Sequence, residues 1–121
     1  MASILIVDDS RTSRKILRNL LEQSGHIVVD EAVNGEEGLN KYKQYHPDIV
    51  TMDITMPVLD GIESLKAIME EDSSAKVVMV TAAGQKNKMV EAVKYGAAEF
   101  IAKPFEAGQI AAMIEEVLNY K

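Results

Sequence analysis

Apolar residues along the chain form short continuous runs separated by longer stretches with helical spacing. Strand-type runs cover residues 4–7, 49–52 and 77–80, and more mixed runs cover residues 27–32 and 98–102. A short apolar run that ends abruptly at polar residues is typical of a strand buried on both faces. The run at 27–32 contains two acidic residues, so it predicts an edge strand.

Helical spacing follows each of these runs. We expect helices over about residues 10–24, 34–46, 62–69, 85–95 and 106–119. Ser10 and Asn34 stand at expected N-caps, and Glu37 follows Asn34 at the spacing of a capping box. The apolar stripes of the first and last helices comprise Ile16, Leu17, Leu20 and Leu21, and Ile110, Met113, Ile114, Val117 and Leu118.

Five strands that alternate with five helices through short loops predict an α/β domain. Its sheet should be parallel, doubly wound and covered on both faces by right-handed crossovers. A chain of 121 residues is long enough for one hydrophobic core, so residues 1–121 are expected to form a single domain.

Composition narrows the function. The chain has no cysteine and two histidines, which disfavours thiol chemistry and His- or Cys-based metal sites. Its net charge of −6 argues against direct nucleic-acid binding. No apolar stretch approaches the length of a membrane span, and the start of the chain lacks the pattern of a secretory signal. We therefore expect a cytoplasmic protein.

Chemistry-bearing residues stand where four of the five predicted strands end. Asp8 and Asp9 follow the first, Asp53 ends the third, Thr81 ends the fourth and Lys103 follows the fifth. Taken singly, each has an ordinary structural interpretation, and Asp53 alone is more often a turn former. Ligands of an open parallel sheet bind beyond the carboxyl ends of its strands, so the coincidence of these residues favours a functional site.

Three neighbouring carboxylates repel one another, by about 3 kcal/mol for each pair at about 5 Å and an effective dielectric near 20. A hard divalent cation such as Mg2+ offsets this repulsion with oxygen ligands. An ammonium and a hydroxyl beside that cation suit a phosphoryl group. In the absence of a Ser/His pair, a cysteine or a Gly-rich phosphate loop, the expected nucleophile is a carboxylate, and Asp53 is best placed.

These motifs resemble the receiver domain of two-component response regulators, and most closely its single-domain chemotaxis type. The resemblance covers essentially the whole chain. It implies a flavodoxin-like fold with five strands in the order 2-1-3-4-5. The segments that carry it are residues 5–9, 52–57 with 60–61, 80–82 and 103–105.

The resemblance also implies a role for each site residue. Asp53 would accept a phosphoryl group from the phosphohistidine of a histidine kinase or from acetyl phosphate. Mg2+ would be bound by Asp9, Asp53 and the backbone carbonyl of Thr55, with Asp8 acting mainly through water. Thr81 and Lys103 would contact the phosphoryl oxygens.

A switch and its partners are implied as well. Thr81 would move toward the phosphate, Phe100 would turn inward, and the face formed by the fourth helix, fifth strand and fifth helix would change shape. Chemotaxis members carry tyrosine at the position of Phe100, so this chain lacks that hydroxyl. A cis bond is implied between Lys103 and Pro104.

The expected protein is a monomeric phosphoacceptor that catalyses its own phosphorylation and dephosphorylation without being a turnover enzyme. Its expected partners are a histidine kinase and the flagellar motor switch protein or another output protein. Alternatives are a phosphorelay intermediate and the receiver of a larger regulator. A Mg2+-dependent phosphatase with an Asp nucleophile is a more distant alternative, because it would carry an acid where Thr55 stands.

Overall fold

The computed structural model describes residues 1–119, so the last two residues of the predicted domain 1–121 lie outside the described part. The strands are β1 (Ser3–Val7), β2 (Ile27–Ala32), β3 (Ile49–Asp53), β4 (Val77–Thr81) and β5 (Glu99–Ala102). The helices are α1 (Arg11–Gln23), α2 (Gly35–Tyr45), α3 (Gly61–Glu71), α4 (Lys86–Lys94) and α5 (Ala107–Leu118). All ten predicted elements are therefore confirmed within a few residues.

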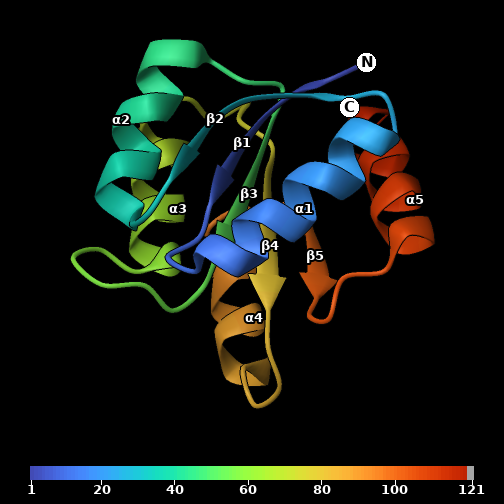
Figure 1. The fold of residues 1–121 in the computed structure, drawn as a ribbon. Coiled ribbons are helices and arrows are strands. Elements are labelled where there is room, and N and C mark those ends of the chain that lie inside the picture. The colour runs from blue at the N-terminus through green and yellow to red at the C-terminus, as the bar shows by residue number, and fades with distance from the viewer. Residues whose placement is uncertain (120–121) are drawn as a thin grey trace.

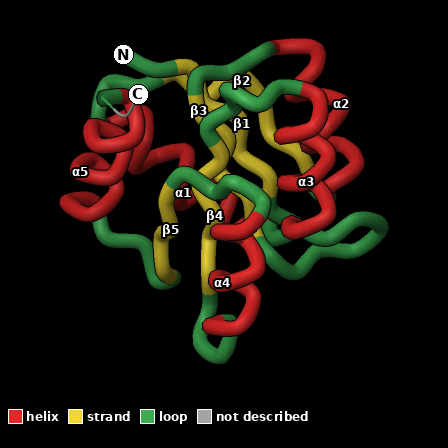
Figure 2. Tube along the Cα trace, turned by 180° about the vertical axis from the view of Figure 1, so that it is seen from behind, coloured by secondary structure: helices red, strands yellow, loops and turns green. Residues whose placement is uncertain are grey.

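The five strands form one parallel sheet in the order β2-β1-β3-β4-β5. Helices α1 and α5 cover one face, while α2, α3 and α4 cover the other, as Figures 1 and 2 show from the two sides. This is the predicted doubly wound, flavodoxin-like architecture. The strand arrows in Figure 1 point to one common lower edge, where the carboxyl ends of β1, β3, β4 and β5 meet.

The central strands divide the core into two layers because successive side chains of a strand point to opposite faces. In β3, Val50 and Met52 pack toward α2 and α3, while Ile49 packs toward α1 and α5. Every residue of β3 and of β4 is buried, as continuous apolar runs predict. Strand β2 lies at the sheet edge, also as predicted.

The helix caps follow the sequence closely, with one difference. The side chains of Ser10, Asn34 and Asp60 each accept a hydrogen bond from a backbone N–H in the first turn of their helix. At α2 the reciprocal bond of the predicted capping box is shifted by one residue, because Glu37 accepts from the N–H of Val33 and not from that of Asn34.

The apolar stripe predicted for α1 is narrower in the structure. Leu17 and Leu21 are buried and Leu20 is half-buried, but Ile16 is 47% exposed. Ile16 therefore lies at the exposed margin of the predicted stripe.

No helix in the described part of the chain combines the length and apolarity that a bilayer crossing requires.

Candidate functional site

The lower edge of the sheet collects the acidic residues singled out in the sequence. Oxygen atoms of Asp8, Asp9 and Asp53 lie within 4.8 Å of one another. Asp8 and Asp53 are buried, whereas Asp9 is exposed. β1 and β3 are neighbours in the sheet, and their carboxyl ends therefore bring together acids that are far apart in the chain.

Lys103 brings a positive charge to the same point. Its Nζ lies 3.2 Å from Oδ2 of Asp8 and 3.7 Å from Oδ2 of Asp53. Lys103 follows β5, its backbone N–H donates to the carbonyl of Thr81 on β4, and its bond to Pro104 is cis, as expected. The ammonium thus partly offsets two buried carboxylates and stands where it can contact an anion bound beside them.

Asp53 is destabilised in its ionised form. Burial raises its pKa to about 6, and the charge of Asp8 adds to the rise, while Lys103 and the backbone N–H of Ile54 act in the opposite direction. The Ile54 N–H donates to Oδ1 of Asp53 over 3.1 Å. A carboxylate held at this energetic cost favours a function for the charge, because an asparagine of the same shape would fold without the cost.

The loop after β3 folds tightly over the backbone of Asp53. The N–H of Gly61 donates to the carbonyl of Ile54 over 2.7 Å. A Cβ at position 61 would lie 2.0 Å from the carbonyl oxygen of Asp53, so no side chain fits there. Glycine is therefore required to begin α3 this close to the end of β3.

The two residues predicted to form the switch have other contacts in this structure. Thr81 is buried at the end of β4, and its hydroxyl donates to the carbonyl of Ile101 over 3.3 Å. Phe100 is half-buried and packs against the core on the α2–α4 face of the sheet. Their switching roles stay predictions.

Gln85 was missed as a site residue and predicted only as a helix start. Its Nε2 donates to the hydroxyl of Thr55 over 3.1 Å, and its Oε1 accepts from the N–H of Ala82 over 2.7 Å. The side chain therefore joins the loop after β3 to the loop after β4. No local pattern signals this role, because the contact joins positions 30 residues apart.

The donor set fits a divalent cation. Carboxylate oxygens are the ligands that Mg2+ prefers, and Mg2+ commonly keeps several waters beside one or two carboxylates. The exposure of Asp9 leaves solvent access for those waters. The buried negative charge, which Lys103 offsets only in part, provides the electrostatic attraction.

Comparisons with known proteins identify the family. The family model "Response regulator receiver domain" matches residues 4–115. The chain belongs to the response regulator receiver family. Within that family it is 47% identical over 116 residues to the chemotaxis protein CheY of Listeria monocytogenes, covering 96% of this chain and 98% of the relative. It is 45% identical over 116 residues to CheY of Bacillus subtilis, with 96% and 97% covered.

The receiver fold is equally clear among solved structures. A CheX-CheY-BeF3-Mg+2 complex from Borrelia burgdorferi has a CheY-like chain that superposes with a TM-score of 0.92 at 38% identity, covering 98% of this chain and 90% of that one. A response regulator receiver domain from Clostridium thermocellum gives a TM-score of 0.92 at 30% identity, with 98% and 95% covered. The predicted resemblance and fold are confirmed.

Proposed function

We propose that this receiver domain is a Mg2+-dependent phosphoacceptor in which Asp53 is the nucleophile. The observation that carries the proposal is the convergence of Asp8, Asp9, Asp53 and Lys103 at one edge of the sheet. Asp53 ends β3, which lies between β1, the strand before Asp8 and Asp9, and β5, the strand before Lys103. Burial raises the pKa of Asp53 to about 6.

The proposed reaction transfers a phosphoryl group from the phosphohistidine of a histidine kinase, or from acetyl phosphate. A carboxylate oxygen of Asp53 forms a bond to phosphorus while the bond from phosphorus to the histidine nitrogen breaks, and the leaving nitrogen keeps that electron pair. Lys103 contacts a phosphoryl oxygen, and Thr81 donates a hydrogen bond to another once its hydroxyl leaves Ile101.

Asp9, Asp53 and the backbone carbonyl of Thr55 would hold Mg2+, with Asp8 acting mainly through water. When bound, the cation neutralises the charge that gathers on the phosphoryl oxygens. Asp8 and Asp9 hold that positive charge beside Asp53, so the carboxylate of Asp53 can approach a phosphodonor that is itself negatively charged.

We propose that the output is chemotaxis, carried by a monomer in the cytoplasm. The 47% and 45% identity to two chemotaxis CheY proteins supports this output. The changing face would be α4, β5 and α5, with Phe100 as its aromatic residue and the flagellar motor switch protein as partner. Phe100 has no hydroxyl, so its contribution to that partner would be apolar.

The phosphatase alternative is disfavoured at the site itself. The position two residues beyond Asp53 is Thr55, whose hydroxyl accepts a hydrogen bond from Gln85. A threonine in this position cannot act as the second acid that such an enzyme needs. Receiver domains are phosphoacceptor switches and not turnover enzymes, and the same role is proposed for this one.

Intact-mass spectrometry after incubation with acetyl phosphate tests the proposal. Wild-type protein should gain the mass of one phosphoryl group in Mg2+ and none in EDTA. Asp53→Asn should gain none in either buffer. An adduct that forms equally well in EDTA, or that survives in Asp53→Asn, would contradict the proposal.

A further inference from the structure

Arg14 reaches from α1 to the backbone of the acidic pair. Its Nη1 donates to the carbonyl oxygen of Asp8 over 2.8 Å, and its side chain is only 14% exposed. Asp8 lies just beyond β1, where the main chain leaves the sheet to enter α1. A nearly buried guanidinium thus binds the strand end from which both Asp8 and Asp9 project.

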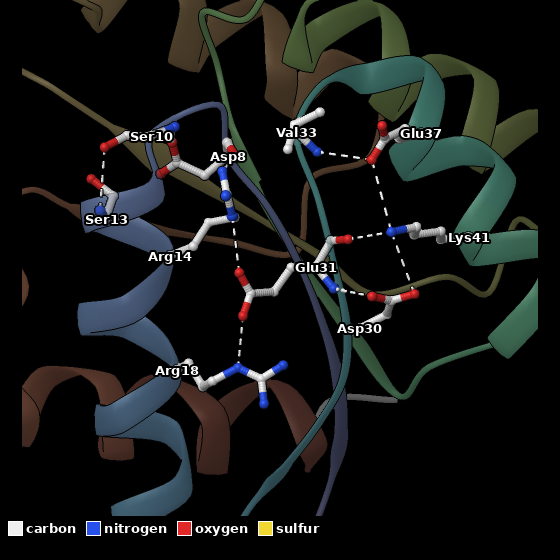
Figure 3. A network of polar contacts seen from close by, with 10 residues as sticks. All are labelled: Asp8, Ser10, Ser13, Arg14, Arg18, Asp30, Glu31, Val33, Glu37 and Lys41. Atoms are coloured by element: carbon white, nitrogen blue, oxygen red, sulfur yellow. Dashed lines mark hydrogen bonds and ion pairs between the residues drawn. The ribbon is translucent and has the colours of Figure 1, made fainter.

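Glu31 of β2 orients this guanidinium. Oε1 of Glu31 accepts from Nε of Arg14 over 2.9 Å, while Oε2 accepts from Nε of Arg18 over 2.7 Å. Figure 3 shows the Glu31 carboxylate between the two arginines, with the Glu31 carbonyl held by Lys41 on the other side. Burial raises the pKa of Glu31, but hydrogen bonds from Arg18 and Arg14 outweigh it and hold that pKa below its ordinary value, so the carboxylate is ionised at neutral pH.

Asp8 is consequently held at four points. Its N–H donates to Ala32 on β2, and its carbonyl accepts from Arg14. Its Oδ1 accepts from the N–H of Ser10, while its Oδ2 pairs with Lys103. Of these contacts, the one from Arg14 is the only side-chain bond to the backbone of Asp8 recorded in the described part of the chain.

We propose that Arg14 is a positioning residue for the cation site: held by Glu31, it fixes the backbone of Asp8 so that the carboxylates of Asp8 and Asp9 face Asp53. The inference rests on the proposed function, because it assumes that these acids bind Mg2+. Groups that orient metal ligands through hydrogen bonds commonly change metal affinity by 10–100-fold when they are removed.

A positioning role and a purely electrostatic role of Arg14 predict opposite changes in Mg2+ affinity when Arg14 is removed. A positive charge near the site weakens cation binding, so loss of the charge alone would tighten it. Loss of the bond to the Asp8 carbonyl frees the backbone of Asp8 and Asp9. Part of the binding free energy of Mg2+ is then spent on ordering these two residues, so the cation binds more weakly. The direction of the change in affinity therefore separates the two roles.

Arg14→Met tests the inference, with Arg18→Met as a matched control. Both variants lose one arginine of α1 and one ion pair with Glu31, but Arg18 has no recorded contact with Asp8 within residues 1–119. Mg2+ titrations followed by NMR of the amide signals at residues 8–10 and 53 give the Kd, and urea unfolding in EDTA gives the stability of each variant. Arg14→Lys keeps the charge but not the planar fork, and it serves as a second variant.

We expect Arg14→Met and Arg14→Lys to weaken Mg2+ binding about tenfold. Arg18→Met should change the Kd by less than about twofold, even if it lowers stability as much. An unchanged or tighter Kd in Arg14→Met, or an equal loss of affinity in Arg18→Met, would overturn the positioning role. If wild-type protein fails to bind Mg2+ in the same titration, it is the proposed function that fails.

Discussion

Replacing Asp53 by asparagine removes a charge that the folded protein holds at a cost. The side chain of Asp53 is only 12% exposed, so solvent screens its interaction with Asp8 weakly. The pKa of Asp53 rises from 3.8 to about 6 on folding. At about 1.4 kcal/mol for each tenfold change in proton affinity, this rise corresponds to about 3 kcal/mol of lost stability at neutral pH.

The sign of the pH dependence follows from the two pKa values. Below the unfolded value of 3.8, Asp53 is protonated in both states and has no effect on folding. Between 3.8 and about 6 the unfolded chain loses its proton first, so the contribution of Asp53 to stability falls as the pH rises. In metal-free buffer, the free energy of unfolding of Asp53→Asn should exceed that of wild type by about 3 kcal/mol at pH 7.5 and by about 1 kcal/mol at pH 4.5.

Urea unfolding followed by circular dichroism in EDTA measures this difference. Glu116→Gln is a matched acid-to-amide control at an exposed position of α5. Its free energy of unfolding should lie within about 0.5 kcal/mol of the wild-type value. Saturating Mg2+ should remove the extra stability of Asp53→Asn relative to wild type. The cation stabilises wild-type protein by binding to it, whereas the variant lacks the Asp53 carboxylate that would hold the cation. If Asp53→Asn unfolds at lower urea than wild type in EDTA at pH 7.5, the assigned repulsion is wrong.

Three further substitutions test the surroundings of the site by urea unfolding at neutral pH. Gly61→Ala should destabilise the protein by about 3 kcal/mol, because the new Cβ would meet the Asp53 carbonyl at 2.0 Å; a neutral result would refute that close approach. Val58 has a φ of 69° and is 75% exposed. Val58→Gly should therefore stabilise the folded protein by about 1 kcal/mol, and a loss of stability would contradict the inferred backbone strain at this residue. Tyr42→Phe removes a 2.7 Å bond from the hydroxyl to Asp72 and should cost about 1 kcal/mol; an unchanged midpoint would show that the bond is unimportant.

Local patterns predicted most of the fold because they act over a few residues. The buried runs at β3 and β4 and the caps at Ser10 and Asn34 are all short-range signals, and each is confirmed. The exposure of Ile16 was not predicted, because an apolar stripe in the sequence does not define its own edges. The positive φ of Val58 was not predictable from residue type, since β-branched residues rarely adopt it.

The candidate site could be predicted in part for a similar reason. Parallel strands bring their carboxyl ends to one edge, so Asp8, Asp53 and Lys103 could be placed at the same edge of the sheet from the residues that end or follow each strand. The contacts of Arg14 with Glu31 and of Gln85 with Thr55 join positions 17 and 30 residues apart. Such contacts depend on side-chain geometry that no periodicity in the sequence encodes.

The most direct test of the central claim is the position of the phosphoryl group. Wild-type protein is incubated with acetyl phosphate and Mg2+, reduced with borohydride to convert an acyl phosphate to an alcohol, and digested for tandem mass spectrometry. The account predicts a reduced side chain at residue 53 and at no other acid. Reduction at Asp8 or Asp9 in place of Asp53, or a phosphate ester on a hydroxyl residue, would contradict it.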